Sequence, residues 1–547
     1  MKTSAETRPF AALDIEAVGN TWSQFDLAVA VTHTGEVVVF NTRDEMQEWV
    51  EQREGRVASH SGGTYDFLFL QGKDNVLLTG SRILTATVGK AHLLDTYPMM
   101  PMSLKKIGKA VGLAKLDVDR SRLAELTRKE IEEYCTRDSQ VLARALHQHR
   151  DFCLSVPHRK PSWPSTAGAT AIYCAEAYEP EAVRHLGRHP LDPDTWVDHS
   201  SAVQGGRTEV WKLGEVNTRT YCYDIKSSYP ARYLEAPLPV GPWRPVSHEV
   251  HGVPAVWRVR FKQPRNRLPL LSSDGVFCHE GEGWATHEEL AAARQELGAK
   301  VEVMHGWVSQ RVLPFGQHYV RTLYKLKEAG SPFAKVCLNS LHGKFGQRIL
   351  GGIWRRNGEG PEDYVRDEEL SLPRWYQRPL VEAHILARAR VALWRAMDRL
   401  HRYGCSVLYT DTDSIHTNAD PDTFARVTKA PMGEELGAWE LKGVATRALY
   451  LARKCYALHW EDGTEFVACK GFPQAAPGEK AQSHQVDWGV LAKAWKHPVE
   501  VTAPRWGLEG FGTGKDNAAK ARPFRRTLAA HAGAGKVRTG CDVWYSH

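Results

Sequence analysis

Apolar and polar residues alternate at the spacing of β-strands through much of the first 150 residues. Three runs, FAALDIE from residue 10, LAVAVTH from residue 27 and EVVVF from residue 36, predict strands, and helical patterns accompany them. The clearest helix follows Thr127, which forms a capping box with Glu130. Its apolar side is formed by Leu126, Ile131, Val141, Leu142 and Leu146. This alternation of strands and helices predicts an α/β domain.

The pattern changes after a proline-rich break, VPHRKPSWP, at residues 156–164. Beyond it we expect a strand at TYCYDI (220–225), a helix at about 333–347 and a long amphipathic helix at about 380–402. SVLYTDTDSIHT (406–417) predicts a hairpin. The last hundred residues look poor in strands. The second part of the chain is therefore expected to be a larger α+β unit.

The composition is typical of a large soluble protein. The 547 residues, 42% of them hydrophobic, can bury several domain cores. A net charge of +7 and a pI near 8.8 suit a polyanionic partner without requiring one. The ten cysteines include no CxxC pair, which indicates neither a zinc site nor a disulfide framework and favours a reduced, intracellular compartment. No signal peptide and no apolar run of ~18 residues is present, so no membrane partner is expected.

Positive charge gathers near the C-terminus, between residues 515 and 538. The basic residues there are Lys515, Lys520, Arg522, Arg525, Arg526, Lys536 and Arg538, against a single acid, Asp516. Taken alone, this run indicates a solvated, partly disordered tail, with contact to a polyanion as the second interpretation.

Four carboxylates mark the first domain. Asp14 and Glu16 stand two residues apart on a predicted strand and share one face of it. Asp66 follows a glycine-rich turn, and Tyr134 and Asp138 are four residues apart on one helical face. Each residue alone is most simply structural or exposed on the surface. As a set, they suit binding of two metal ions and activation of water against a phosphodiester.

This order of motifs, DxE, YD and YxxxD, resembles the DEDD-type 3′-5′ exonuclease domain of family B DNA polymerases. The resemblance implies that the four carboxylates are metal ligands and that Tyr134 orients the attacking water. Lys115 in KLDV matches a lysine used near the scissile phosphate, and Ser61 and Tyr65 match positions that contact DNA. The family usually has Thr and Asn where this chain has Ala17 and Ser61, so a weaker grip on the single-stranded end is expected.

A second set of polar residues lies beyond residue 220. Asp224 ends a predicted strand and precedes Ser228 and Tyr229 in a stretch that also reads as an ordinary proline-terminated turn. Lys335, Asn339 and His342 follow at helical spacings and share one face, which suits a triphosphate and a base pair.

Asp411 and Asp413 stand one residue apart in the predicted hairpin. Like charges so close raise each other's pKa, a cost that divalent cations remove. A plain turn is the simpler interpretation, because Asp favours turns. Apolar flanks on both sides favour a rigid hairpin that presents the carboxylates to metal ions.

These stretches resemble the polymerase motifs of the same family, DxxSLYP, Kx3NSxYG and DTD. The resemblance implies that Asp224 and Asp413 bind two Mg²⁺ or Mn²⁺ ions, with Asp411 beside them. The implied nucleotide-binding residues are Ser228, Tyr229, Lys335, Asn339 and His342, among which Tyr229 excludes a 2′-hydroxyl and His342 replaces the usual Tyr. ARKCYAL matches the KxY motif, so Lys454 and Tyr456 would contact the primer strand.

Other features are similar to the protein-primed polymerases of phages and linear plasmids. They are the overall size, SLKKIGK at 103–109, a sizeable segment between the second and third motifs, and a linker with Gly205 and Gly206, in which Val203 replaces the Tyr of YxGG. The linker glycines would contact DNA.

The resemblance implies an RNase H-like exonuclease domain followed by a right-hand polymerase, an α/β and α+β multidomain fold. We expect the exonuclease domain at 1–165, a linker region at 166–215, palm and fingers at 216–450, and a thumb with a basic C-terminal region at 451–547. Subfamily insertions would occupy about 260–325 and 348–380.

The function implied is DNA-directed DNA synthesis with 3′-5′ exonuclease activity, using template and primer DNA and deoxynucleoside triphosphates. A terminal protein would serve as primer, in the cytoplasm of a bacterial host if the gene belongs to a phage or plasmid. Two alternatives stay open: a nucleic-acid-primed polymerase of the same fold, and an inactive DNA-binding scaffold. Intact carboxylates argue against the scaffold.

Overall fold

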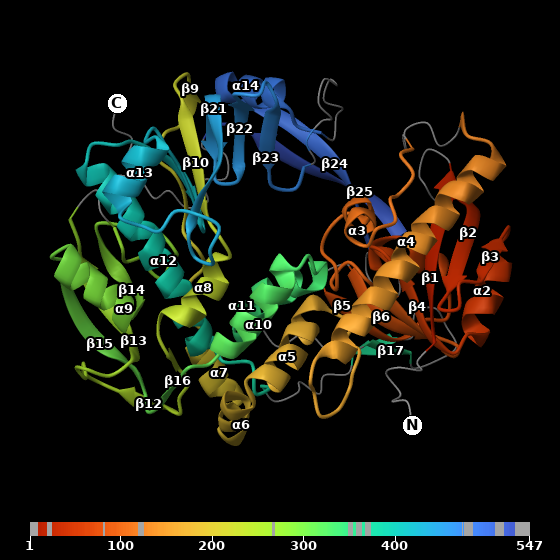
Figure 1. The fold of residues 1–547 in the computed structure, drawn as a ribbon, viewed down its shortest axis with the longest axis horizontal. Helices are drawn as coiled ribbons and strands as arrows, with labels where there is room; N and C mark the ends of the chain where they lie inside the picture. Colours follow the sequence, from red (N-terminus) through yellow and green to blue (C-terminus); the bar gives the residue numbers. More distant parts are fainter. Residues whose placement is uncertain are drawn as a thin grey trace.

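The computed structural model describes residues 9–18, 24–79, 82–118, 125–264, 268–347, 354–356, 364–366, 373–472, 474, 485–508 and 519–530. Two large sheets dominate the chain (Figure 1). The N-terminal sheet, drawn in red and orange, lies opposite the sheet built from the middle and later parts of the chain. Helices α5 (Ala167–Tyr178), α10 (Gln317–Glu328) and α11 (Pro332–Phe345) lie between these two parts.

The N-terminal sheet contains β1 (Phe10–Val18), β2 (Gln24–Thr32), β3 (Val37–Phe40), β4 (Gly55–Ser59), β5 (Asp74–Thr79), β6 (Arg82–Val88) and β7 (Ala91–Asp95). β4 pairs in parallel with β1 and β7, and the other pairs are antiparallel. Helix α4 (Arg128–Ser155) begins with the expected capping box and packs against β1 and β2. The short turns η1 (Gly62–Thr64) and η2 (Asp66–Phe69), with α2 (Arg43–Gln52) and α3 (Leu104–Ala110), complete this part.

Two strands from much later in the chain extend the same sheet. β17 (Trp354–Arg356) pairs with β18 (Tyr364–Arg366) and with β5, through the Trp354 and Val76 positions. Described residues of the expected insertion at 348–380 therefore join the N-terminal sheet rather than the sheet that follows them.

The second large sheet contains β8 (Thr208–Val210), β9 (Gly214–Val216), β10 (Thr220–Ile225), β19 (Val407–Asp411), β20 (Ser414–Thr417), β21 (Trp439–Ala452), β22 (Cys455–Trp460) and β23 (Glu465–Cys469). The strand order is β23-β22-β21-β10-β20-β19-β8, with β9 on β21. Helices α8 (Ser228–Glu235), α12 (Pro379–Arg402) and α13 (Pro421–Thr428) accompany it, and α12 shares a buried core with Tyr223, Ile225 and Ile415. The hairpin expected within 406–417 is confirmed.

A third sheet lies below the second sheet in Figure 1 and contacts α12 through β14 (Glu280–Thr286). Helices α6 (Pro180–Arg188) and α7 (Pro193–Ser200) lie to its right in the same view. The sheet contains β12 (Trp243–Val246), β13 (Ala255–Lys262), β14 and β15 (Lys300–Ser309), in the order β12-β15-β13-β14. Helix α9 (His287–Ala291) and a π-turn (Ala292–Glu296) connect β14 to β15, and β11 (Leu238–Pro239) pairs with β16 (Val312–Leu313). The sheet spans 243–309, so it starts before the expected insertion at 260–325.

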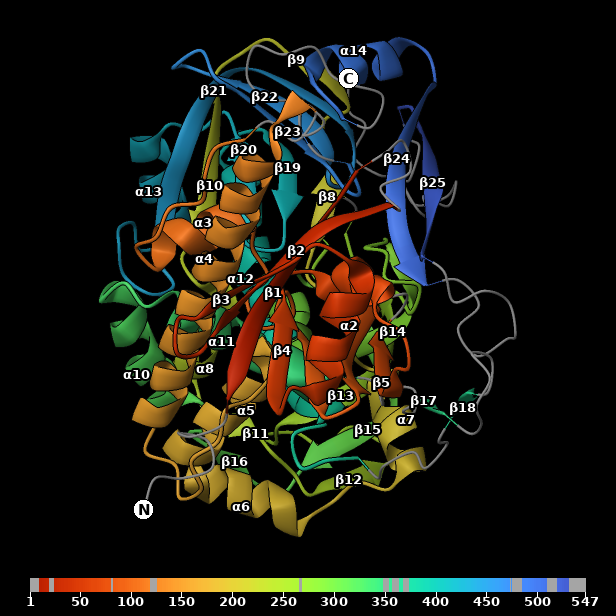
Figure 2. The same ribbon diagram turned by 90° about the vertical axis from the view of Figure 1, so that its right-hand side faces the viewer.

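The expectation of few strands in the last hundred residues is wrong. β22 and β23 form a hairpin, and after α14 (Trp488–Lys496) come β24 (Val499–Leu508) and β25 (Ala519–Leu528), a separate two-stranded ribbon (Figure 2). The basic residues of β25 conceal its strand character, because they interrupt the apolar and polar alternation by which a strand is recognised in a sequence.

The expectation of a disordered basic tail is wrong for four of its residues. Lys520, Arg522, Arg525 and Arg526 lie on β25, whereas Lys515, Lys536 and Arg538 lie outside the described residues. Across the described residues, no helix combines the length and apolar character needed to cross a membrane.

Candidate functional site

The carboxylates of the N-terminal domain converge from a strand and a helix. β1 presents Asp14 and Glu16 on one face, α4 adds Asp138, and one oxygen of each lies within 4.8 Å of the others. Asp66 opens η2, and its Oδ1 accepts a hydrogen bond from Ile15 N–H at 3.0 Å. The fourth carboxylate is thereby tied to the strand that carries the first two.

Burial gives these carboxylates an unusual electrostatic state. Burial, with Asp138, Glu16 and Asp66 adding to it, raises the pKa of Asp14 well above its usual range, and burial raises the pKa of Asp66 to about 8. Within the described part of the chain, Asp14 Oδ2 is buried and has no hydrogen-bond partner. Crowded carboxylate oxygens with an unused acceptor fit hard divalent cations, which would stabilise the ionised forms.

Lys115 and Tyr134 lie at the edge of this cluster. Lys115 Nζ forms an ion pair with Asp138 Oδ2 and stands 4.4 Å from the centre of the Tyr134 ring. Burial opposes the charge on Lys115, but Asp138 raises its pKa on balance, so the lysine stays cationic. Cys135, which sequence reasoning did not single out, donates from Sγ to Asp14 O at 3.3 Å.

The loop before Asp66 is shaped by a residue that sequence reasoning missed. Ser61 adopts a left-handed backbone (φ 67°), and its N–H donates to Asp95 Oδ1 at 3.0 Å. Gly63 N–H donates to Asp95 Oδ2 at 3.2 Å. Tyr65 packs its ring edgewise on Phe69. Asp95, a buried carboxylate at the end of β7, fixes the loop, and its position at a strand end was the available signal.

The second set of carboxylates is positioned by strand register. Asp224 on β10 and Asp411 on β19 both pair with Ser414 of the intervening strand β20. Ile225 N–H donates to Asp413 O at 2.9 Å, which fixes the tip of the hairpin beside β10. Thr412 adopts a left-handed backbone (φ 62°) between the two hairpin aspartates. The structure thus brings Asp224 and Asp413 together from positions 189 residues apart in the sequence.

Lysines neutralise part of this second set. Burial, then Asp224 and Asp411, raise the pKa of Asp413 to about 7. Lys442 Nζ lies 3.7 Å from Asp224 Oδ2, and Lys454 Nζ lies 2.9 Å from Asp411 Oδ1. Asp411 also accepts a hydrogen bond from Thr208 Oγ1 at 2.9 Å. Asp224 and Asp411 thus each contact a lysine, and Asp411, with the closer lysine and the hydrogen bond from Thr208, is the more fully engaged of the two.

The predicted nucleotide-binding residues line α8 and α11. Lys335 and Asn339 are exposed on α11, whereas Ser228 is buried in the first turn of α8. His342 is half-buried against Tyr229, with the ring centres 4.1 Å apart. Its Nδ1–H donates to Glu382 Oε1 at 3.0 Å, and Glu382 on α12 is almost fully buried. Sequence reasoning missed Glu382, which lies in the first turn of α12, where an acidic residue is ordinary.

The linker glycines lie directly against the hairpin. A Cβ added to Gly206 would stand 2.9 Å from Tyr229 Oη and 3.0 Å from Thr412, whereas nothing lies within 4 Å of one added to Gly205. Arg390 of α12 donates to Gly205 O at 3.0 Å. Only glycine at position 206 lets the backbone approach the hairpin so closely.

A basic cavity opens beside these glycines. Its volume is about 570 Å³, and its cationic lining residues are Arg453, Lys454, Lys470 and Arg526. Tyr456, next to this lining, packs its ring 4.7 Å from that of Tyr409. Cationic side chains around an open cavity suit a phosphate backbone.

Sequence comparisons find polymerases. The family described as DNA polymerase type B, organellar and viral, matches residues 114–353. The DNA-directed DNA polymerase of Enterobacteria phage PRD1 is 24% identical over 457 residues, covering 76% of this chain and 75% of the relative. The DNA polymerase of Streptococcus phage Cp-1 is 26% identical over 285 residues, covering 46% of this chain and 48% of the relative.

Structural comparison shows the fold. Phi29 DNA polymerase complexed with primer-template DNA matches with a TM-score of 0.75 at 17% identity, covering 95% of this chain and 100% of that structure. Its ternary complex matches with a TM-score of 0.73 at the same identity, covering 96% of this chain and 99% of that structure. The expected fold class, an exonuclease domain followed by palm, fingers and thumb, is confirmed. Together, the shared fold, the matched segment and the phage relatives make the chain similar to type B DNA polymerases of the organellar and viral group.

Proposed function

We propose that this chain is a DNA polymerase that also degrades DNA from the 3′ end, and that both reactions depend on pairs of divalent metal ions, Mg²⁺ or Mn²⁺. The observation that carries the exonuclease proposal is the convergence of Asp14, Glu16 and Asp138 within 4.8 Å, with Asp66 tied to the same strand. When bound, two such ions activate the attacking oxygen and neutralise charge on the leaving oxygen.

In the exonuclease site the protein's own residues position the reactants. Lys115, held between Asp138 and the Tyr134 ring, directs a positive charge toward the cluster where a scissile phosphate would lie. Tyr134 would orient the attacking water, and Ser61 and Tyr65 would contact the single-stranded 3′ end. β24 of the C-terminal ribbon packs against η1, which places a second element beside that end.

In the polymerase site Asp224 and Asp413 would hold the metal pair, with Asp411 beside them. The exposed Lys335 and Asn339 on α11 would meet the triphosphate and base, and Tyr229 would lie beneath the sugar. Lys454, Tyr456 and the linker glycines would contact the primer strand. Template, primer and deoxynucleoside triphosphates are the partners that this arrangement suits, in a bacterial host cell if the gene belongs to a phage or plasmid.

A single assay tests both activities. A primer labelled at its 5′ end and annealed to a longer template should be extended when nucleotides and Mg²⁺ are present, and shortened when nucleotides are omitted. Removal of metal with a chelator should stop both reactions, and Mg²⁺ or Mn²⁺ should restore them. Extension without any shortening would refute the exonuclease proposal and leave the polymerase assignment intact.

We further infer that synthesis starts on a terminal protein. The support is the resemblance in size, in the SLKKIGK segment and in the inserted segments, and the physical reason is that a protein hydroxyl can take the place of a primer 3′-hydroxyl beside Asp224 and Asp413. Incubation with a candidate terminal protein encoded near the polymerase gene, one labelled deoxynucleotide and metal should give a covalent protein-nucleotide adduct. The adduct should be lost in Asp224→Asn.

The alternative is initiation on ordinary nucleic-acid primers. Efficient extension of oligonucleotides, with no adduct on any protein encoded near the polymerase gene, would favour it. Initiation on DNA primers should also weaken as the salt concentration rises, because salt releases DNA held by the basic cavity. The rates of both initiation modes should therefore be measured at several salt concentrations.

A further inference from the structure

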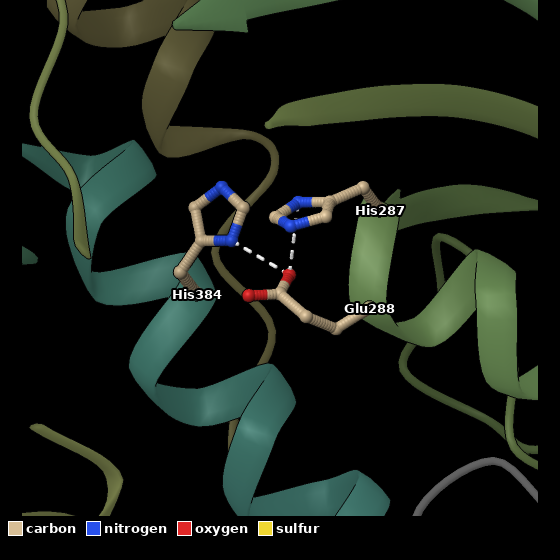
Figure 3. Close-up of side chains that lie close together, drawn as sticks. All are labelled: His287, Glu288 and His384. Atoms are coloured by element: carbon tan, nitrogen blue, oxygen red, sulfur yellow. Dashed lines mark hydrogen bonds and ion pairs between the residues drawn. The ribbon is translucent and has the colours of Figure 1, made fainter. Parts of the chain in front are cut away.

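A cluster of metal-ligand side chains lies outside both active sites, where the third sheet meets α12. His287 and Glu288 open α9, and His384 lies in the second turn of α12. Figure 3 shows the two imidazole rings and the carboxylate pointing toward one another from the two helices. One ligand atom from each residue lies within 4.8 Å of the others.

Both histidines use the same nitrogen toward the same oxygen. His384 Nδ1 lies 2.9 Å and His287 Nδ1 lies 3.1 Å from Glu288 Oε2 (Figure 3). Ligands around a tetrahedral Zn²⁺ at bond lengths of ~2.1 Å stand about 3.4 Å apart, so only small movements would admit the ion. We propose that His287, Glu288 and His384 bind one transition-metal ion, best matched by Zn²⁺, and that this ion clamps the third sheet to α12.

Both imidazoles make their polar contacts through Nδ1, the nitrogen that would bind the ion. His384 is fully buried, and within the described part of the chain its Nε2 has no hydrogen-bond partner. The N–H of Ala255 also lies 3.4 Å from His287 Nδ1, a long contact that a metal ion on Nδ1 would replace.

The cluster also has the outer support and the access that a metal site requires. Arg388 Nε donates to Glu288 Oε1 at 3.1 Å, which leaves Oε2 facing the histidines and fixes the carboxylate plane. The side chains of His287 and Glu288 are 35% and 21% exposed, so an ion and a water ligand can enter from that side. Two imidazoles and one carboxylate select Zn²⁺, whereas the all-carboxylate active sites select Mg²⁺.

The position of the cluster predicts what the ion would do. Arg388 also donates to the carbonyl oxygens of Arg232, Ala236 and Pro237 at the end of α8, the helix that carries Tyr229. An ion between α9 and α12 would therefore stabilise the supports of the nucleotide site without touching the reacting atoms. This inference is independent of the proposed exonuclease and of protein priming.

Metal content and melting temperature test the site in the full-length protein. After dialysis against a chelator and transfer to excess Mg²⁺, which fills the carboxylate sites, the protein should take up about one Zn²⁺ per chain and its Tm should rise. Co²⁺ in place of Zn²⁺ should give the intense visible absorption of a tetrahedral site.

His287→Ala should lose the Zn²⁺ uptake, the Tm rise and the Co²⁺ bands. His248→Ala, an exposed histidine on the same part of the chain, should keep all three. If His287→Ala does not fold, His287→Gln decides by the same measurements. The proposal is overturned if the parent protein takes up no Zn²⁺ under these conditions, or if the folded His287 variant takes up as much as the parent.

Discussion

The two sets of carboxylates, proposed to bind metal ions in the same way, differ in their degree of burial. In the N-terminal domain Asp138 is 1%, Asp66 4% and Glu16 6% exposed. In the palm, the side chains of Asp224 and Asp411 are 28% and 20% exposed. The N-terminal cluster is packed between a strand and a helix, whereas the palm carboxylates stand at the open tip of a hairpin.

The difference reflects what each site would have to admit. The N-terminal site needs to admit only a strand end and water, so its ligands can be assembled in advance. The palm site must also accept a triphosphate and release pyrophosphate, so its carboxylates stay accessible and are paired with Lys442 and Lys454 meanwhile. If the two sites are independent, changes in one should leave the other intact.

The largest effect is expected from Asp413→Asn. Loss of one charged ligand should reduce primer extension by more than about 100-fold, because even changes behind metal ligands cost 10- to 100-fold. Shortening of a single-stranded oligonucleotide should continue at the parent rate. Extension at the parent rate would remove Asp413 from the metal site.

The reciprocal change is Asp14→Ala combined with Glu16→Ala. We expect loss of 3′-end degradation by more than about 100-fold, because two converging oxygens disappear. Nucleotide addition, measured with the same primer and template, should stay within a factor of a few. Loss of both activities in a variant that keeps its Tm would contradict two independent sites.

A smaller effect separates the two linker glycines. Gly206→Ala should reduce extension about tenfold, because the new methyl group displaces Tyr229 or the hairpin by a few tenths of an ångström. Gly205→Ala has free space and is the matched control. Exonuclease rates on single-stranded DNA should be equal in the two variants. Equal extension rates in the two variants would show that the close approach of the backbone at position 206 to Tyr229 and the hairpin does not affect extension.

The smallest expected effect is on stability, and here the two regions share a feature, since each contains a buried histidine whose pKa is lowered. Burial, with Arg56 adding, lowers the pKa of His149 in α4 to about 3, and burial lowers that of His416 in β20 to about 3. Each accepts a hydrogen bond at Nδ1, from Trp163 Nε1 and Tyr450 Oη respectively. The unfolded chain takes up these protons near pH 6.5, whereas the folded chain does so only near pH 3. Stability is therefore lost as pH falls through this window.

Each histidine should account for about 1.4 kcal/mol of the loss between pH 7.5 and pH 5.5. Urea unfolding at the two pH values, compared for the parent and for His149→Gln and His416→Gln, isolates this contribution from that of the carboxylates. Each variant should lose about 1.4 kcal/mol less than the parent on acidification. A pH dependence identical to the parent's would mean that the histidine is protonated in the folded state.

Local signals predicted much of the fold. The capping box of Thr127 and Glu130 starts α4, the period of apolar residues delimits α12, and alternation around Asp411 and Asp413 predicts the hairpin. Each of these depends on residues near one another in the chain. The C-terminal strands escaped prediction because four of the ten residues of β25 are basic and because, among the described residues, its partner is β24 alone.

The carboxylates themselves could be selected from the sequence, because charged groups inside apolar strands are costly unless a function requires them. The residues that hold the predicted site in place could not be selected in this way, because nothing in their own segments distinguishes them. They are Asp95, which binds the Ser61 loop, Glu382, which binds His342, and Arg390, which binds the linker.

By itself, the sequence predicted the resemblance to the family, the order of the parts and the carboxylates proposed as metal ligands, since these predictions follow from local spacing and residue chemistry. Only the tertiary structure decided that β17 joins the N-terminal sheet and that His384 lies against His287 and Glu288, nearly 100 residues earlier. Such contacts depend on how sheets and helices pack, and packing is a property of distant residues acting together rather than of any one segment.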